Sequence, residues 1–599
     1  MKLIAALLLS LASMAAGPAV AAEPAPLPVL DARLGEIAAG KRFVSVAFHD
    51  VVDEADQLDG DAITTDRLIA FFDLLRGAGW TAITLEDVDA AGRGTKPLPE
   101  KAILITFDDG YASLYTRVYP LALAYRMPVV AALKGAWLTP PPGAMVRYGD
   151  HEVPREHFVS WEQVREMARS GWVEIASHSN ELHRGVLANP QGNTMPAAVT
   201  RLYADETYED DATYRQRLQD DMKALRELFT REIGRPPRTM VWPYGRYSAS
   251  AVEAAQSAGF RFALTLDPEP ADAARPMALA RYLPNYNPSL ATIENSLRFT
   301  PRLPTAQRLV CVDPASIWAE DAATTDEHLG RLIERLRALG STAVVLDAAV
   351  QGADGHLVAA WFPTGTLPLR ADLLSRLAWQ LQTRGGVRVF LRLPVAAAGA
   401  TPGFDAARVR ALFADLGAHV PASGLYFDDA PGLAALDLSA VPGIDDIGMP
   451  WQVQRLRHAL DPGRLPPADA LALQAFREVE LARPGLQLAL LAPAGALSRS
   501  SAVADLTLFA TAPDAASARG AVQRLGAERG PGINTPRRTG LWLVGDAPPA
   551  AAELSAAMRG MQVGGGTVLG WCPDDAVAKL PAAALVAPDV SASTFPLKF

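Results

Sequence analysis

Short apolar runs that end abruptly in polar residues recur along the first half of the chain, with amphipathic segments between them. The runs have the length and β-branched content of strands buried in a parallel sheet. The segments between them place apolar residues three and four positions apart, as amphipathic helices do. The expected strands are 43–48, 81–85, 103–107, 129–133, 173–176, 239–242 and 262–266, and the expected helices are 64–78, 115–125, 161–170, 214–230 and 249–259. This alternation predicts an α/β fold on a mainly parallel sheet or barrel.

The alternation breaks at Thr300-Pro301-Arg302-Leu303-Pro304 and then resumes, which predicts a second unit of the same kind. Residues 189–211 of the first half are polar and expected to be exposed. The second unit's expected strands are 309–312, 343–346, 387–393 and 425–427, and its expected helices are 325–339, 371–383 and 409–416. We therefore expect a signal peptide at 1–22, a lead-in at 23–41, a first domain at 42–300, a linker at 301–308 and a second domain at 309–599.

The N-terminus has the form of a secretory signal. Lys2 supplies a positive end, residues 4–11 an apolar run, and Ala19-Val20-Ala21 a small-residue cleavage pattern. The run is too short to span a bilayer, and no later segment reaches the roughly 20 apolar residues that a span needs. No cysteine adjoins the cleavage site, so lipid attachment is not expected and the mature chain should lie outside the cytoplasm.

Composition narrows the class of protein and of partner. A chain of 599 residues, 49% hydrophobic and 20% charged, is too long for one core and fits a soluble globular protein of two or more domains. A formal charge of −10 argues against nucleic acid or an anionic membrane as the main partner. Cys311 and Cys572 are far apart in sequence. They could pair in an oxidising compartment, but we expect two isolated buried thiols.

The chemistry gathers where strands end. Asp108, Asp109 and a glycine follow the run 103–107, and two adjacent carboxyls at the mouth of a buried strand repel each other unless a cation offsets them. A solvated Asp-Asp-Gly turn is the alternative. His49, the pair His178 and His183, and Trp242-Pro243-Tyr244-Gly245 also follow strands. Since the carboxyl ends of parallel strands share one edge, these four groups are expected to form one site.

The two later histidines need an irregular backbone to share a ligand. Five residues apart on a helix, His178 and His183 would point about 140° apart, so they must lie on a loop. With a carboxylate they would supply two imidazoles and an acid, a set that suits zinc, nickel, cobalt or iron. Ordinary loop histidines are the alternative for the pair, a strand-end histidine for His49, and core aromatics for Trp242 and Tyr244.

These sequences resemble the motifs of the polysaccharide deacetylases, the NodB-like carbohydrate esterases. The resembling stretches are Thr106-Phe107-Asp108-Asp109-Gly110, His178 with His183, and Trp242-Pro243-Tyr244-Gly245. The five-residue histidine spacing and the early Phe48-His49-Asp50 resemble one branch, the periplasmic poly-β-1,6-N-acetyl-D-glucosamine N-deacetylases of biofilm export systems. The resemblance implies two (β/α)-barrel-like domains, the first a circularly permuted deacetylase barrel and the second a glycoside-hydrolase-like TIM-type barrel.

The resemblance also implies residue roles. One divalent metal ion would be held by Asp109, His178 and His183. Asp108 would be the general base that activates a water for attack on an acetamide carbonyl, and His49 would protonate the leaving amine. The backbone N–H of Tyr244 would hold the oxyanion, with Trp242 beside it as an oxyanion or substrate residue. Many relatives carry a base-orienting arginine where this chain has Val241, so something else must position Asp108.

The second half resembles the same branch in Trp361-Phe362-Pro363-Thr364, Leu369-Arg370-Ala371-Asp372-Leu373 and Tyr426-Phe427-Asp428-Asp429-Ala430. There the resemblance implies a domain that binds, and in some members cleaves, partly deacetylated polymer. Asp428 or Asp429 would supply an acid and Asp313 would line the groove. Residues 505–513 depart from the acid-and-aromatic motif expected there, so cleavage by this chain is left open.

The expected function is therefore metal-dependent N-deacetylation of poly-β-1,6-N-acetyl-D-glucosamine in the periplasm, during export of a biofilm exopolysaccharide. Its partners would be that polysaccharide and the outer-membrane export machinery. Two alternatives remain: a deacetylase of chitin or peptidoglycan, and a noncatalytic glycan-binding export scaffold. A scaffold has no need to keep the five polar groups of the site together, which counts against it.

Overall fold

The computed structural model describes residues 37–149, 151–299, 307–434, 449–492, 503–512, 514–527, 539–543 and 568–572, with positions 436, 438, 444, 447, 556, 557, 559 and 560. The expected signal peptide, the lead-in before residue 37 and linker residues 301–306 lie outside the described residues. Among the helices of the described part, none combines the length and apolar character needed to cross a bilayer.

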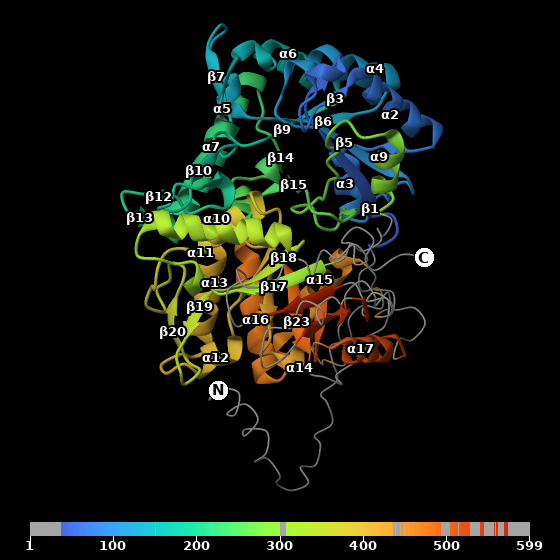
Figure 1. Ribbon diagram of the computed structural model, residues 1–599. Helices are drawn as coiled ribbons and strands as arrows, with labels where there is room; N and C mark the ends of the chain where they lie inside the picture. Colours follow the sequence, from blue (N-terminus) through green and yellow to red (C-terminus); the bar gives the residue numbers. More distant parts are fainter. Residues whose placement is uncertain are drawn as a thin grey trace.

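The first unit is a curled, mainly parallel sheet wrapped by helices, in the upper half of Figure 1. Its strands follow the order β15 (Phe262–Leu264), β14 (Thr239–Val241), β9 (Val173–Ser177), β6 (Val129–Leu133), β5 (Ala102–Phe107), β1 (Arg42–Phe48) and β16 (Ala271–Asp272), with β4 (Thr81–Ala82) beside β5. Only β16 runs antiparallel to its neighbour among these described strands.

An irregular segment, Leu279–Tyr282, bridges the two ends of this curled sheet. The Leu279 N–H donates to the Ala263 carbonyl of β15 at 2.9 Å, and the Tyr282 N–H donates to the Ser45 carbonyl of β1 at 2.8 Å. The Tyr282 carbonyl in turn accepts from the Ala47 N–H at 2.8 Å. The polar backbone groups along both strands are thereby satisfied, as buried groups must be. The segment takes the place of a closing strand.

Strict alternation along the strands sorts side chains between the interior and the helices. Leu104, Ala132 and Ala176 belong to the interior cluster, whereas Ile105 and Ile175 pack outward against the helices. Successive residues of a strand point to opposite faces, so this pattern fixes the direction of the residues that follow each strand. The interior-facing positions are the even-numbered ones in β5 and β9.

The covering helices begin and end largely where the sequence pattern indicates. Helix α6 (Trp161–Ser170) begins at the cap Ser160, whose side chain accepts from the Gln163 N–H, and ends at Gly171 with φ +77°. The other helices of this unit are α2 (Thr65–Gly77), α3 (Leu85–Gly92), α4 (Tyr119–Tyr125), α5 (Gly135–Leu138), α7 (Asp211–Ile233), α8 (Ala249–Ser257) and α9 (Leu290–Leu297).

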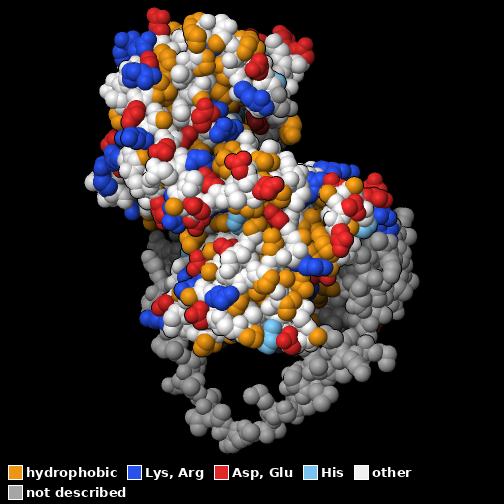
Figure 2. Space-filling model, turned by 90° about the vertical axis from the view of Figure 1, so that its left-hand side faces the viewer, with side chains coloured by type: hydrophobic (Ala, Val, Ile, Leu, Met, Phe, Trp, Pro, Cys, Tyr) orange, Lys and Arg blue, Asp and Glu red, His pale blue; other side chains and the backbone are white. Residues whose placement is uncertain are grey.

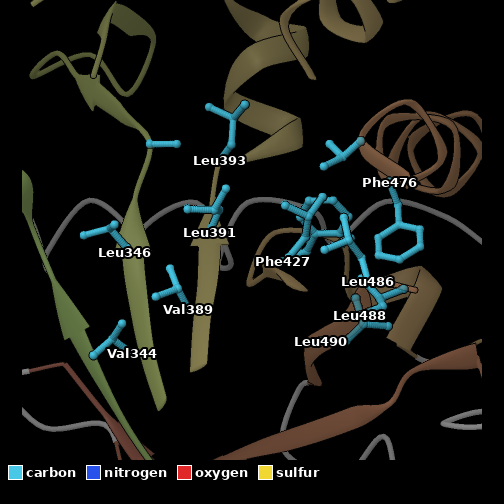
Figure 3. Close-up of a cluster of buried hydrophobic side chains, with 14 of the residues drawn as sticks. Val344, Leu346, Val389, Leu391, Leu393, Phe427, Phe476, Leu486, Leu488 and Leu490 are labelled. Atoms are coloured by element: carbon cyan, nitrogen blue, oxygen red, sulfur yellow. The ribbon is translucent and has the colours of Figure 1, made fainter. Parts of the chain in front are cut away.

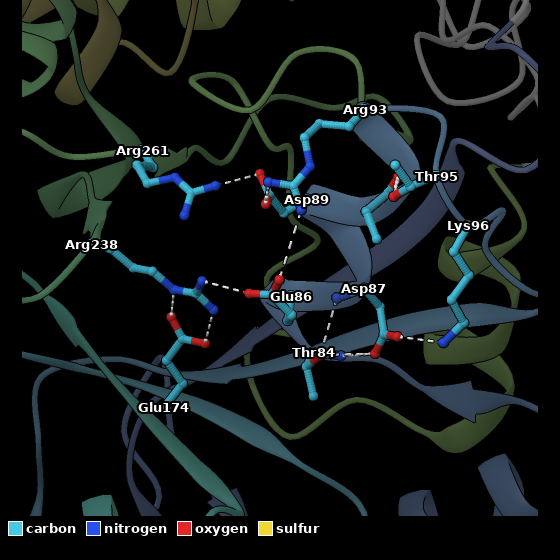
Figure 4. A network of polar contacts seen from close by, with 11 residues as sticks. Thr84, Glu86, Asp87, Asp89, Arg93, Thr95, Lys96, Glu174, Arg238 and Arg261 are labelled. Carbon is cyan, nitrogen blue, oxygen red and sulfur yellow. Dashed lines mark hydrogen bonds and ion pairs between the residues drawn. The ribbon is translucent and has the colours of Figure 1, made fainter.

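At the amino end of the strands, a charged network ties helix to sheet (Figure 4). Arg238, just before β14, pairs with Glu174 of β9 at 2.9 Å and with Glu86 of α3 at 3.0 Å. Arg261 pairs with Asp89 of α3 at 2.7 Å. This end of a barrel-like sheet lies away from the carboxyl ends where catalytic groups gather, so we assign the network to stability.

The second unit is a closed barrel of eight parallel strands, in the lower half of Figure 1. Its strands are β17 (Gln307–Val312), β18 (Ala343–Asp347), β21 (Arg388–Arg392), β22 (Gly424–Phe427), β23 (Gln487–Ala492), β24 (Leu506–Thr511), β25 (Thr539–Leu543) and β26 (Val568–Trp571). Side chains such as Val344, Leu391 and Leu488 point outward into a core shared with the helices (Figure 3). The prediction of two barrel-like α/β units is thus confirmed.

The helices around the second barrel include α10 (Ala322–Ala338), α11 (Leu374–Thr383), α12 (Val395–Ala400), α13 (Ala406–His419), α15 (Pro450–Ala459) and α16 (Pro467–Ala482). On the face shown in Figure 2, acidic and basic side chains are interspersed over the described surface. That face offers no extended basic surface of the kind that nucleic acid requires.

The prediction of two isolated thiols is wrong, because Cys311 and Cys572 form a disulfide. Strand β26 pairs directly with β17, and Val310 lies opposite Trp571. The next residue on each strand is therefore a neighbour across the seam where the barrel closes. The sequence separation of 261 residues conceals this proximity, since barrel closure brings the first and last strands together.

Part of the stretch 189–211 is buried, although the whole stretch is expected to be exposed. Asn189 is fully buried and donates to the Ser375 hydroxyl of the second unit at 3.3 Å. Tyr208 donates to the Asp372 carboxylate, again across the two units, at 2.6 Å. The stretch overlaps the short hairpins β10–β11 (Gly185–Leu187, Thr194–Pro196) and β12–β13 (Tyr203–Ala204, Thr207–Tyr208), which lie beside α10 in Figure 1. Asn189 and Tyr208 therefore contact the second unit, whereas residues 204–207, 210 and 211 are exposed, as expected.

Candidate active site and metal centre

Three of the expected site residues enter the interior of the first sheet by strand alternation. Asp108 continues the inward positions of β5, after Thr106, and His178 continues those of β9, after Ala176. His49 continues the inward positions of β1 in the same way. Asp108 and His178 are 3% and 1% exposed. The carboxyl end of the sheet therefore gathers these groups into one buried site.

The carboxylate of Asp109 lies between two imidazoles. Its Oδ1 atom is 3.4 Å from Nε2 of His178 and 3.3 Å from Nε2 of His183. Asp109 has φ +72°, so the chain turns sharply after Asp108 and the two carboxyls diverge. The same Oδ1 has no hydrogen-bond partner among the described residues, although it is buried. A buried carboxylate oxygen left without a donor is what a cation site requires before it binds.

His178 and His183 direct ring nitrogen atoms toward the Asp109 carboxylate. Nδ1 of His178 lies 2.9 Å from the Val241 carbonyl, so Nδ1 carries the proton and Nε2 is free to ligate. Burial lowers the pKa of His178 to about 4 and, with the nearby charge of Lys134, that of His183 to about 3. Both rings are therefore neutral at pH 7. Two neutral imidazoles and a carboxylate, with ligand atoms within 4.8 Å of one another, fit a divalent transition metal.

Burial raises the pKa of Asp109 despite the neighbouring histidines. A divalent cation at this position would reverse that effect, because it stabilises the ionised carboxylate directly. The raised pKa of Asp109 and its unpartnered Oδ1 atom thus both indicate a cation site at this carboxylate. The expected ligand set is thus brought together by the fold.

Asp108 is held by an arginine that sequence reasoning missed. Arg281 donates from Nη1 and Nη2 to the two carboxylate oxygens at 2.8 and 2.9 Å, and its side chain is fully buried. Nη1 also donates to the Thr106 hydroxyl at 2.8 Å. Burial raises the pKa of Asp108, but the guanidinium outweighs it and holds that pKa at about 2. Asp108 is therefore an ionised, oriented carboxylate.

Arg281 supplies the charge that relatives are expected to carry at Val241, but from a different part of the chain. Val241 points into the same interior cluster, but Arg281 comes from the irregular segment that bridges β15 and β1. The sequence signal is an arginine directly after the short apolar run 277–280. No strand is expected at that run, so the direction of Arg281 could not be inferred.

His49 lies at the same mouth. It is half-buried, and its charged form is close enough to lower the pKa of both Asp108 and Asp109. The next residue, Asp50, is fixed by the Ser113 hydroxyl, which donates to it at 2.6 Å. His49 is thus placed beside the two carboxyls and within reach of solvent.

The aromatic pair after β14 divides into two roles. Tyr244 has φ +57°, is 46% exposed, and its ring centre lies 4.4 Å from that of His183. Trp242 is fully buried with Met240 on the outward face of β14, under α8. Alternation turns Val241 inward and Trp242 outward. The Trp242 side chain therefore lies in the core beneath α8, on the opposite face of β14 from the interior of the site.

A second cluster of charge lies at the carboxyl end of the closed barrel. Arg392 after β21 donates from Nη2 to Asp347 at 2.8 Å and lies 3.4 Å from Asp428. Asp313 is exposed, and its charge acts on Asp347. Asp429 faces the other way and accepts the Ala396 N–H at the start of α12, at 2.6 Å. Of the two alternatives, Asp428 therefore lies in the mouth. Asp347 and Arg392 were missed, although both end strands.

The departing segment at residues 505–513 contributes no acid to that mouth within its described part. Asp505 precedes β24 and pairs with buried Arg457 at 2.8 Å, at the opposite end of the barrel. Strand β24 ends at Thr511, within the stretch 505–513 where the resemblance predicts an acid and aromatics. Asp505 is thus a structural residue.

Comparison with known families agrees with this geometry. Residues 95–263 match the polysaccharide deacetylases, and residues 311–406 match hypothetical glycosyl hydrolase family 13. One match lies in each unit: the first unit is similar to the polysaccharide deacetylases, and the second is similar to a glycosyl hydrolase family.

The chain is 34% identical over 434 residues to poly-β-1,6-N-acetyl-D-glucosamine N-deacetylase of Escherichia coli K12, an alignment that covers 67% of this chain. The chain spans 64% of the length of that relative. A solved deacetylase domain of BpsB from Bordetella bronchiseptica is 40% identical, with a TM-score of 0.37, covering 41% of this chain and 96% of that one. The PgaB (BpsB) glycoside hydrolase domain of the same organism is 23% identical, with a TM-score of 0.36, covering 48% and 99%.

Proposed function

We propose that the first unit hydrolyses the N-acetyl groups of a polysaccharide. The observation that carries the proposal is the adjacency of a cation-ready Asp-His-His cluster to a second carboxylate that Arg281 keeps ionised. Amide hydrolysis needs a base for water, a group that polarises the carbonyl, and an acid for the leaving amine. The proposed roles assign all three to residues gathered at the carboxyl end of the sheet.

Each residue has a separate task. Asp108 accepts the proton of the attacking water, because its pKa of about 2 leaves it ionised at neutral pH. Asp109, His178 and His183 hold the metal, which when bound polarises the acetamide oxygen as a Lewis acid. His49 delivers a proton to the amine nitrogen as the C–N bond breaks. The backbone N–H of Tyr244 supports the oxyanion.

For the substrate, we propose poly-β-1,6-N-acetyl-D-glucosamine, acted on in the periplasm during export, with the outer-membrane export machinery as partner. The similarity to the Escherichia coli enzyme of that name supports the polymer. The disulfide supports an oxidising compartment. We assign residues 42–300 to the deacetylase and 309–599 to the second domain.

The test is acetate release by the full chain from β-1,6-linked N-acetylglucosamine oligomers. Asp108→Asn should lower kcat by at least about 100-fold with metal content unchanged, since only the base is lost. Asp109→Asn should lose both metal and activity, and a chelator should reproduce that loss until metal is restored. Glu327→Gln, on the exposed face of α10, is the control. Acetate release that survives chelation and Asp108→Asn alike would refute the proposal.

The same assay distinguishes the proposed function from the two alternative functions that the sequence leaves open. Faster release from chitin or peptidoglycan fragments than from the β-1,6 oligomers would replace the proposed polymer. Metal binding without acetate release from any of them would favour the export scaffold.

For the second unit, we propose binding of the partly deacetylated polymer at the mouth of the barrel. Among the described residues of this mouth, Asp313, Asp347 and Asp428 outnumber Arg392, so the mouth attracts the glucosamine cations that the first unit would create. Asp428→Asn should weaken retention of partly deacetylated oligomers and leave fully acetylated ones unaffected. Unchanged retention of both would exclude this mouth as the binding site. Hydrolysis by the second unit would be detected in the same mixtures as shortened chains.

A further inference from the structure

The five-residue spacing of His178 and His183 demands a specific turn between them. Ser179 has φ +69°, so the chain leaves the strand sharply after His178. The Gly135 N–H, at the start of α5, donates to the Ser179 carbonyl at 3.1 Å. A Cβ atom at Gly135 would lie 2.5 Å from Oδ1 of the Asn180 side chain, so a larger residue there would displace that side chain. One side of the turn is thus held by backbone.

The other side is held by a buried carboxylate. Asp221 lies midway along α7 and is 8% exposed. Its Oδ2 accepts the Asn180 N–H at 3.0 Å and its Oδ1 accepts the Glu181 N–H at 2.5 Å. Both oxygens are therefore used on two successive amides of the turn. A carboxylate on the buried face of a helix is costly, and burial raises the pKa of Asp221 to about 6.

The end of the turn is held by a buried ammonium. Lys134 directly follows β6, is 4% exposed, and donates from Nζ to the His183 carbonyl at 3.1 Å. The same Nζ lies 4.3 Å from the centre of the Trp137 ring, and that ring lies 5.0 Å from the imidazole of His183. Backbone and ring of His183 are thus fixed by neighbouring residues of one short segment.

We propose that Asp221 and Lys134 are positioning residues of the metal centre. They lock the turn from Ser179 to Leu182 so that Nε2 of His183 converges with Nε2 of His178 on the Asp109 carboxylate. Neither residue touches the metal or the substrate. The inference rests on the proposed metal centre, but not on the identity of the polymer. It explains how two histidines five residues apart, which would diverge on a helix, can bind one ion.

The experiment measures Co²⁺ affinity of the full chain by competition with a chelator, together with the visible spectrum of the Co²⁺ form and thermal unfolding of the metal-free form. Asp221→Asn keeps one acceptor and should weaken Co²⁺ binding about 10- to 100-fold, the range for groups that orient metal ligands. Lys134→Met should act in the same direction, and both should alter the visible bands, because His183 is displaced from the ion.

Two controls separate positioning from general loss of structure. Asp220→Asn changes the neighbouring exposed carboxylate of α7 and should leave Co²⁺ affinity within twofold of the parent chain. Leu218→Ala opens the core beneath the same helix and should lower the unfolding temperature with the affinity of the folded protein unchanged.

The outcomes are distinct. If Asp221→Asn does not fold, Lys134→Met, which leaves α7 intact, decides alone. A folded variant of either kind with affinity within twofold of the parent would overturn the inference. A parent chain that binds no Co²⁺ would overturn both the inference and the proposed metal centre. Metal binding lost in the variants without any acetate release by the parent would uphold the inference and remove the proposed activity.

Discussion

At the scale of single residues, the direction of a side chain decides its chemistry. The sequence predicts which acids and histidines end strands, and strand periodicity then sends His49, Asp108 and His178 into one interior. Arg281 could not be predicted, because it lies on a segment whose conformation is set by hydrogen bonds to two strands remote in sequence. The same periodicity, applied to β14, would have placed Trp242 outward.

The Arg281 pair predicts a pH effect. In the parent chain the pKa of Asp108, about 2, lies below its ordinary value of 3.8. The pair therefore stabilises the fold above about pH 4, and this contribution is lost as the pH falls through about 2. In Arg281→Met only His178 and His49 are left to oppose burial, which raises the pKa of Asp108, so the acid limb of kcat/KM for acetate release should move upward by roughly one unit or more.

That variant should also lose about 3–5 kcal/mol of stability, because a buried charge is left without its partner. Arg298→Met, which removes an exposed arginine paired with Glu294, should change neither the acid limb nor the stability measurably. An unchanged acid limb in a folded Arg281→Met protein would show that Arg281 does not set the charge of Asp108.

At the scale of helices and strands, helix-capping residues and β-branched residues can favour different structures for one stretch. The stronger preference then determines where a helix or strand begins or ends. The cap Ser160 and terminator Gly171 allow α6 to be predicted residue for residue. The run 81–85 was expected to be a strand throughout, yet only Thr81–Ala82 pairs with β5. Thr84 accepts the Asp87 N–H and starts α3 instead, so a capping box overrides the β-branched content.

The two aromatics after β14 give a prediction at this scale. Trp242 fills the space between the sheet and α8, so Trp242→Ala should lower the free energy of unfolding by about 3–5 kcal/mol. The KM of the folded protein should stay within twofold. Tyr244→Ala should do the reverse, since an exposed ring beside His183 adds little to the core. Denaturant unfolding and acetate kinetics on both variants check this, and a Trp242→Ala effect on KM alone would contradict it.

At the scale of the whole molecule, contacts between distant segments escape a linear reading. Alternation predicts two α/β units, but neither the contacts of Asn189 and Tyr208 with the second unit nor the disulfide could be inferred, because each joins segments remote in sequence. Arg455 of α15 adds a further link, with ion pairs to Glu269 at 3.3 Å and Asp272 at 3.1 Å in the first unit. The first unit thus rests on the second through several polar contacts.

The disulfide across the barrel seam predicts a redox dependence of stability. Reduction should lower the free energy of unfolding of the second unit by about 2–5 kcal/mol. Cys311→Ser, Cys572→Ser and the double variant should all show the same loss and no further response to reductant. Denaturant unfolding with and without reductant measures this, alongside thiol titration to show that the bond is cut. Full stability in the reduced parent chain would contradict the prediction.

The segment Leu279–Tyr282 has a consequence for the order in which this protein acquires its chemistry. A growing chain that ends at residue 264 would already contain the three proposed metal ligands, the proposed base Asp108 and the proposed acid His49, but not Arg281. In such a chain Asp108 would lack the guanidinium that outweighs burial, so its ionised form would be less favoured than in the complete protein. The base is poised only when the last segment has docked between β15 and β1. The proposed deacetylase activity would therefore appear only after this segment has folded onto the sheet, and a partly synthesised chain would be inactive.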